Sequence, residues 1–144
     1  MDKMTWDDKH TINVFDMDDN QKRLFEYINR IIDVQLKKPK DSNDLIDVLV
    51  ELMEFIKFHF KNEEAFLSKF KFPEIDEHVK DHKKFQKKIQ TFRRWISDDP
   101  SNFTEDMILY LKGWIINHIH EYDVKYGPYI RLNNYLETFN RKKR

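Results

Sequence analysis

Apolar residues recur every three or four positions in four long stretches of this chain. Such spacing places apolar side chains on one face of an α-helix, so each stretch predicts an amphipathic helix. The four predicted helices cover about residues 18–38, 42–69, 74–96 and 104–126. Three sequence breaks support these boundaries: Pro39 after the first helix, Pro73 before the third, and Gly127-Pro128 as the expected stop of the fourth.

Four helices of this length, joined by short loops, are typical of an up-down-up-down four-helix bundle. The low glycine count, 2 in 144 residues, disfavours a fold rich in hairpin turns. We therefore predict an all-α, single-domain protein over residues 1–144. An N-terminal arm (1–17) containing Trp6 and Ile12 is expected to pack over one end of the bundle, and the tail (127–144) to form a short extra helix or fray.

Charge and composition narrow the possible partners. Lys+Arg and Asp+Glu both number 26, so no net charge attracts nucleic acid. The chain has no cysteine, which excludes disulfides, thiolate metal sites and cysteine nucleophiles. No apolar run approaches the roughly 20 residues of a membrane span, and the charged first residues lack the features of a secretory signal. We expect a cytoplasmic protein without nucleic-acid or membrane partners; the oligomeric state stays open, with a monomer as the default.

Histidines lie on the apolar faces of three predicted helices: His59 on the second, His78 and His82 on the third, and His118 on the fourth. Glu63 follows His59 by one helical turn and also faces inward. A lone histidine on an apolar face is more often a satisfied core residue. Burying all of these groups together, however, is costly without a compensating partner. A metal ion compensates all of them at once, because neutral imidazole and carboxylate are its ligands.

The other histidines and acids near these positions are interpreted differently. His10 belongs to the arm, and His120 falls on another face of its helix, where we expect it to be exposed. Neither is predicted to be a ligand. Glu64 and Glu121 are expected to be surface partners of lysines.

The order of these motifs resembles the hemerythrin family. The similarity covers nearly the whole chain, through "QKRLFEYIN", "HFKNEE", "FPEIDEHVKDHKKF" and "WIINHIHEYDVKY". It implies a cofactor of two iron ions, bridged by an oxo or hydroxo group, that reversibly binds O2. The metal ligands that the resemblance implies are His59, Glu63, His78, His82, His118 and Asp123.

The resemblance assigns His78, His82 and His118 to one iron and His59 to the other, with Glu63 and Asp123 as bridges. Helix geometry alone does not select Asp123. On a regular helix, residues five apart differ by about 140° in direction, so Glu121 would lie nearer to His118. The family pattern favours Asp123, and a locally widened helix would reconcile the two.

One position departs from the family pattern. Where the resemblance expects a histidine on the first helix, this chain has Gln21, within "DDNQKRLF". Its amide oxygen is a neutral and harder donor than imidazole nitrogen. Gln21 could ligate weakly, hold a water that ligates, or leave the second metal site partly empty. Each outcome predicts an altered second iron site with a labile ion.

The family's O2 pocket is closed by apolar side chains, and Phe60, Trp114 and Ile115 occupy those positions here. The same residues would be core in any bundle. The expected function is oxygen binding, as a transport, storage or delivery protein without catalytic residues. Two alternatives remain: an iron-dependent redox enzyme acting on peroxide, nitric oxide or Fe(II), and a module that senses iron or O2.

Overall fold

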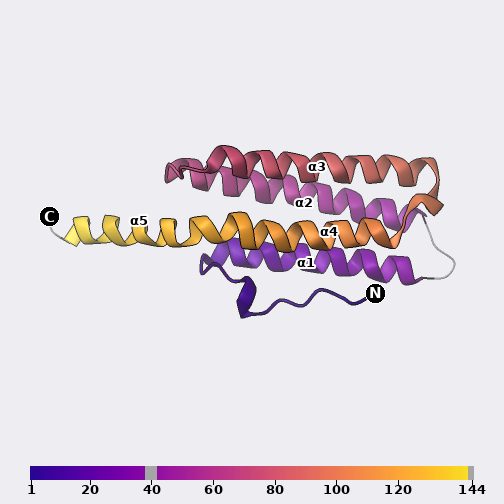
Figure 1. The fold of residues 1–144 in the computed structure, drawn as a ribbon, viewed down its shortest axis with the longest axis horizontal. Coiled ribbons are helices and arrows are strands. Elements are labelled where there is room, and N and C mark those ends of the chain that lie inside the picture. The colour runs from indigo at the N-terminus through magenta and orange to yellow at the C-terminus, as the bar shows by residue number, and fades with distance from the viewer. Residues whose placement is uncertain (38–41, 143–144) are drawn as a thin grey trace.

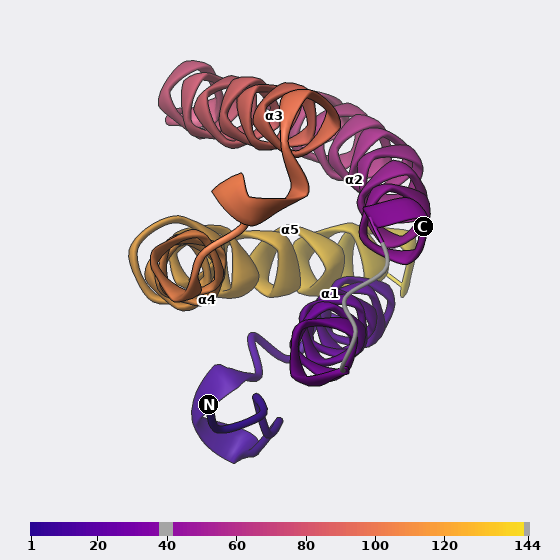
Figure 2. The ribbon, with the colours of Figure 1, turned by 90° about the vertical axis from the view of Figure 1, so that its right-hand side faces the viewer.

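The computed structural model describes residues 1–37 and 42–142. Its long helices are α1 (Phe15–Leu36), α2 (Ser42–Lys69), α3 (Ile75–Asp98), α4 (Glu105–His118) and α5 (Val124–Lys142). Successive rods of the bundle run in opposite directions (Figure 1), and the view along the bundle shows α1, α2, α3 and α4 around a common axis (Figure 2). The predicted all-α, up-down-up-down bundle is confirmed. The break expected at Pro39 lies outside the described residues.

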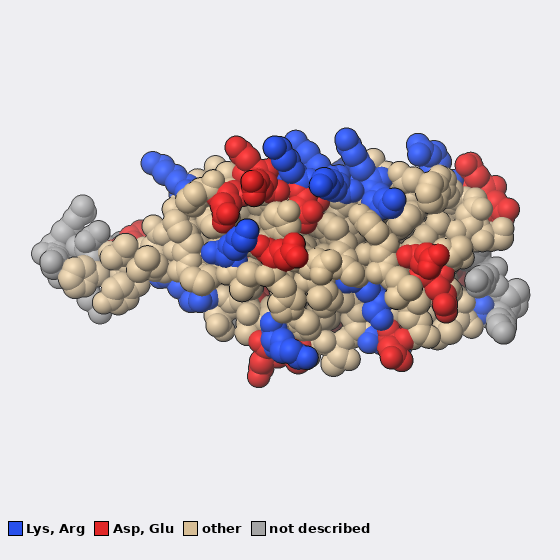
Figure 3. All heavy atoms as spheres, in the orientation of Figure 1, with Lys and Arg blue, Asp and Glu red and all other residues tan. Residues whose placement is uncertain are grey.

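Shorter elements complete the chain: the 3₁₀ turns η1 (Asp8–His10) and η2 (Pro100–Asn102), and a π-helical turn η3 (Ile119–Asp123) between α4 and α5. No described helix combines the length and the apolar character needed to cross a membrane. On the face in Figure 3, Lys and Arg side chains gather along the edge formed by α3, and acidic side chains lie on either side of them and on the face below.

The buried apolar residues form two clusters with a polar layer between them. The larger cluster contains Leu24, Phe60, Phe85 and Ile115, and extends to the α1–α2 loop end of the bundle. The smaller cluster packs together Ile12, Met17, Leu67, Phe72, Tyr126 and Ile130. Along each helix, the buried polar residues fall between members of the two clusters. The amphipathic stripes thus enclose the polar layer on both sides, away from water.

The expected helix stop at Gly127-Pro128 is wrong. The α4 rod continues through η3 into α5, and Pro128 lies inside α5. Tyr126 and Ile130, on either side of the proline, are buried at 0% and 1% exposure against the smaller cluster. Tyr129 also donates its hydroxyl hydrogen to the carbonyl of Phe70, at 2.7 Å. These contacts outweigh the backbone hydrogen bond that proline removes.

The arm also differs from expectation, because it runs along the side of the bundle instead of covering one end (Figures 1 and 2). Asn29 of α1 exchanges two hydrogen bonds with the backbone of Met4, and Lys112 of α4 donates to the carbonyl of Asp2. Gly127 permits the closest approach: a Cβ there would lie 2.7 Å from the Ile12 carbonyl oxygen. The glycine admits the arm and does not end the helix.

The two glycines give a matched test of this packing. We expect Gly127→Ala to destabilise the fold by about 1–3 kcal/mol, because backbone of the arm must move away. Gly113→Ala meets no atom within 4 Å and should stabilise α4 by up to about 1 kcal/mol through helix propensity. Urea unfolding measures the free energy of unfolding of each variant relative to the parent protein. Equal stabilisation by the two substitutions would contradict the close approach of the arm.

Candidate metal centre

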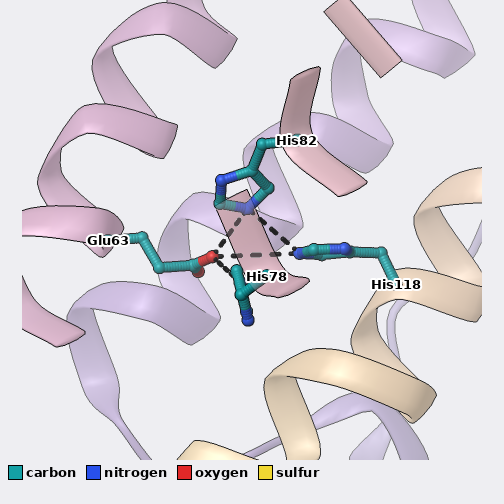
Figure 4. Close-up of side chains that lie close together, drawn as sticks. All are labelled: Glu63, His78, His82 and His118. Carbon is teal, nitrogen blue, oxygen red and sulfur yellow. Dashed lines mark hydrogen bonds and ion pairs between the residues drawn. The ribbon is translucent and has the colours of Figure 1, made fainter. Parts of the chain in front are cut away.

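Four of the side chains singled out from the sequence converge inside the polar layer. Glu63 enters from α2, His78 and His82 from α3, and His118 from the end of α4 (Figure 4). One donor atom from each lies within 4.8 Å of the other three. Glu63 Oε1 is 2.5 Å from His78 Nε2 and 3.0 Å from His82 Nε2. All four side chains are buried, with at most 2% exposure.

Asp123 reaches the same point because the helix widens just before it. The π-helical turn Ile119–Asp123 changes the angular spacing after His118, as the sequence pattern required. Asp123 Oδ1 consequently lies 3.0 Å from His118 Nε2 and 3.2 Å from His78 Nε2. Asp123 is completely buried, whereas Glu121 is exposed. The structure therefore brings Asp123, and not Glu121, into the centre.

His59 and Gln21 lie together on the other side of the two carboxylates. His59 Nε2 is 3.6 Å from Glu63 Oε2. The amide nitrogen of Gln21 donates to Asp123 Oδ2 at 2.5 Å and lies 3.4 Å from His59 Nε2. Gln21 is only 2% exposed. It thus occupies the place on α1 from which the resemblance expects a histidine to reach the centre.

Two carboxylates orient the histidines from outside. His82 Nδ1 donates to Glu64 Oε2 at 3.0 Å, and His118 Nδ1 donates to Asp81 Oδ2 at 2.7 Å. Glu64 is therefore a partner of a buried imidazole, and its interpretation as a surface partner of lysine is wrong. Sequence reasoning missed Asp81, because the pairing crosses from α3 to α4 and leaves no periodic signal within either helix. Such partners fix the tautomer and the ring orientation of a metal-binding histidine.

These hydrogen bonds turn the Nε2 atoms of His82 and His118 toward the centre, where they lie 3.2 Å apart. Asp123 Oδ1 is buried beside them, 3.0 Å from His118 Nε2. Burying carboxylates and imidazoles together is costly unless protons or a bound cation balance the negative charge. The donors present fit a metal ion, since imidazole nitrogen and carboxylate oxygen are typical ligands of iron, zinc and manganese.

Tyr126 supports the centre from the smaller apolar cluster. Its hydroxyl donates to Glu63 Oε2 at 2.9 Å, and burial together with the Glu63 and Asp123 charges raises the pKa of Tyr126 well above its usual value. Burial alone would raise the pKa of Glu63, but hydrogen bonds from His118, His78 and His82 hold it well below the usual range. Glu63 is therefore ionised and fixed in orientation.

Aromatic and aliphatic side chains cover the histidines on the side of the larger cluster. The Phe60 ring stacks on His82, with centroids 3.7 Å apart, and Trp114 stacks on His118 at 4.5 Å. Ile115, the residue after Trp114, is buried at 1% exposure in the larger cluster. Of the three residues expected to form an O2 pocket, Phe60 and Trp114 lie against the histidine cluster.

The fold and the site together define a class: an all-helical bundle whose core holds a histidine–carboxylate cation site. The sequence matches the profile of the hemerythrin HHE cation binding domain over residues 13–130, and the chain belongs to this family. It is 30% identical to a bacteriohemerythrin of Clostridium acetobutylicum, covering 84% of this chain and 96% of that protein. It is 27% identical to a myohemerythrin of Theromyzon tessulatum, covering 84% and 88%. A crystal structure of wild-type hemerythrin superposes with a TM-score of 0.79 at 25% identity, over 87% of this chain and 95% of that one.

The charge of the metal-free centre predicts a pH effect on stability. Burial lowers the pKa of His78, but hydrogen bonds with Asp123 and Glu63 outweigh it and raise the pKa from 6.5 to about 9. A group with a raised pKa stabilises the fold fully below its unfolded pKa and loses that contribution as pH rises through the folded pKa. We expect the unfolding free energy of metal-free protein to fall by up to about 3 kcal/mol from pH 6.5 to 9.

Urea unfolding at several pH values measures this loss. Metal-loaded protein is the control: its profile should be flatter, because the ion replaces the protons and its uptake releases them. A metal-free protein with constant stability over this range would show that His78 is not charged in the fold.

Replacing either outer carboxylate, Asp81 or Glu64, by its amide is expected to weaken metal binding. Asp81→Asn and Glu64→Gln keep the size of each side chain but weaken its hold on the imidazole Nδ1–H. We expect each variant to bind metal about 10–100-fold more weakly than the parent. Titration of metal-free protein with Co²⁺, followed by its visible absorption, measures the affinity. Glu121→Gln is the control: it changes an exposed acid and should leave the Co²⁺ affinity unaltered.

Proposed function

We propose that this chain is a non-haem iron protein that binds O2 at a centre of two iron ions. The observation that carries the proposal is the way each buried carboxylate divides its two oxygens. Glu63 presents Oε1 to His78 and His82, and Oε2 toward His59. Asp123 presents Oδ1 to His78 and His118, and Oδ2 to Gln21. Two carboxylates arranged in this way could hold two neighbouring iron ions, and the ions would supply the O2 chemistry.

The nitrogen donors form two unequal groups around these bridges. His78, His82 and His118 would hold one ion with three imidazoles. His59 and Gln21 would hold the other, which therefore receives a single imidazole. The bound iron pair would supply the electrons and the open coordination position needed for O2. The names of the similar proteins, bacteriohemerythrin and myohemerythrin, support this choice of ligand and metal.

The protein's own contribution is a dry and rigid enclosure. Phe60 and Trp114 cover His82 and His118, and Ile115 is buried in the same apolar cluster as Phe60. Because this wall is apolar, it limits delivery of protons to a bound diatomic ligand. Apart from Glu63 and Asp123, the acids in contact with these histidines are Glu64 and Asp81, which act from outside by holding Nδ1–H groups. The site therefore favours reversible binding over turnover.

Gln21 makes the second ion the weaker one. Its amide nitrogen already donates to Asp123 Oδ2, and the amide must turn by about half a revolution to offer its oxygen instead. By turning, Gln21 would lose its hydrogen bond to Asp123 and would offer the ion only one neutral amide oxygen. A histidine in this place would offer a lone pair without giving up such a bond. We propose that the second ion is labile and that the oxygenated protein is less durable than in relatives with the histidine.

Weak ligation of the second ion also favours an alternative function. An iron ion with fewer protein ligands has positions free for a substrate, as redox enzymes require. Reduction of peroxide or nitric oxide, or oxidation of Fe(II), would use such an ion. Turnover by the purified protein with one of these substrates would select this alternative over oxygen binding.

Iron content and spectroscopy test the main proposal. After anaerobic loading with Fe(II), the protein should hold close to two irons per chain when iron is in excess, and fewer after gel filtration. Exposure to O2 should then give a visible absorption band that disappears under vacuum. Protein that takes up no iron under these conditions would refute the proposal.

Gln21→His gives the sharpest prediction for the second ion. We expect the variant to retain both irons through gel filtration, because imidazole replaces the amide as a donor. A gain of only about 1.4 kcal/mol corresponds to tenfold tighter binding. The oxygen-dependent absorption should also decay more slowly. Gln21→Ala is the matched control, and it should lose the second iron at least as readily as the parent. Identical iron retention in all three proteins would contradict the role assigned to Gln21.

A further inference from the structure

The chain has six histidines, and the four discussed above lie in the metal centre. The remaining two, His10 and His120, are 110 residues apart in sequence, yet His10 Nδ1 lies 3.1 Å from His120 Nε2. His10 comes from η1 in the arm, and His120 from the π-helical turn η3. The fold thus pairs these two histidines outside the centre.

The His10 ring is held in place before any ligand arrives. It packs against the rings of Trp6 and Phe25, at centroid distances of 5.4 and 5.3 Å. Phe25 is 3% exposed and belongs to the core, so it forms a fixed wall. His120 is exposed, which leaves one side of the pair open to solvent. A ligand can therefore reach two nitrogens that are already close together.

We propose that His10 and His120 form a second, exchangeable binding site for a divalent transition-metal ion of the Zn²⁺ type. Imidazole nitrogens bind Zn²⁺ at about 2.0–2.1 Å. An ion at that distance from both nitrogens fits between atoms 3.1 Å apart, at an angle near that of ordinary coordination. Water completes the coordination on the open side, so the ion exchanges more readily than one in the buried centre.

The surroundings of His10 favour the form that binds metal. Asp7 Oδ1 lies 3.9 Å from His10 Nε2, on the far side of the ring from His120. The negative charge there favours the tautomer with its proton on Nε2, which leaves a lone pair on Nδ1. Burial also lowers the pKa of His10, in spite of the Asp7 charge, so the imidazole is neutral at pH 7.

Metal binding at this pair would tie the arm to the bundle. His120 belongs to the same π-helical turn as Asp123, while His10 follows directly after the exposed Lys9. A shared ion would therefore restrain the arm next to a peptide bond that trypsin cleaves. Protection of this bond by Zn²⁺ is a readout independent of the iron centre.

Zinc titration of the iron-loaded, full-length protein tests the proposal. We expect calorimetry to show one more equivalent of Zn²⁺ bound by the parent than by His10→Gln or His120→Gln. Glutamine retains hydrogen-bonding capacity but is a poorer ligand than imidazole, so these variants preserve the fold while removing the site. Asp8→Asn changes an exposed acid of the same turn and should keep the extra equivalent. Zn²⁺ should slow tryptic cleavage after Lys9 in the parent and in Asp8→Asn alone.

Two results would overturn the proposal. Equal Zn²⁺ stoichiometry in the parent and both glutamine variants would mean that the pair is only a hydrogen bond. Loss of the equivalent in one variant but not the other would mean that a single histidine binds the ion. The zinc result depends only on the difference in Zn²⁺ stoichiometry between the parent and the variants. If the proposed iron centre does not form, every protein lacks iron, and metal analysis detects this independently of the zinc titration.

Discussion

The structure depends on a balance of charge inside a dry core. Glu63 and Asp123 are fully buried carboxylates, and burying carboxylate charge is costly unless positive charge lies nearby. In the metal-free protein, that charge comes from protonated histidines, as the raised pKa values of His78 and His118 indicate. A bound cation would take over the same role. The centre is therefore a site prepared for positive charge, whichever cation supplies it.

Several members of the polar layer are held in place by residues outside it. Two apolar clusters exclude water above and below it, which strengthens every interaction between the carboxylates and the imidazoles. Tyr126 fixes Glu63, while Glu64 and Asp81 fix His82 and His118. These restraints keep the donor atoms close to one geometry, so little reorganisation accompanies the uptake of an ion.

The support is uneven between the two sides of the centre. Of the three histidines on one side, His82 and His118 each have a carboxylate at Nδ1, and His78 has none. His59, the single histidine on the other side, also has no hydrogen-bond partner at its buried Nδ1. Gln21, beside His59, is engaged with Asp123. The two sides of the centre therefore differ in the kind of donor they offer and in how firmly each donor is oriented. It gives the proposed labile ion a physical basis in the contacts of α1 and α2.

The sequence by itself determined the helices and the inward direction of the histidines. Each follows from the spacing of residues along one helix, which needs no knowledge of neighbouring helices. Asp123 came from the family resemblance, against the geometry of a regular helix, and the π-helical turn reconciles the two. The place of Gln21 followed from the family pattern, and the structure puts it beside His59.

Only the tertiary structure decided the contacts that cross between segments. Asp81 reaches His118 from a different helix, the arm meets α5 at Gly127, and His10 meets His120 from the far end of the chain. The helix through Pro128 belongs to the same group, because burial of Tyr126 and Ile130 overrides a local signal to stop. Local periodicity cannot encode such pairs, since they depend on how the rods pack and on which side of the bundle the arm lies.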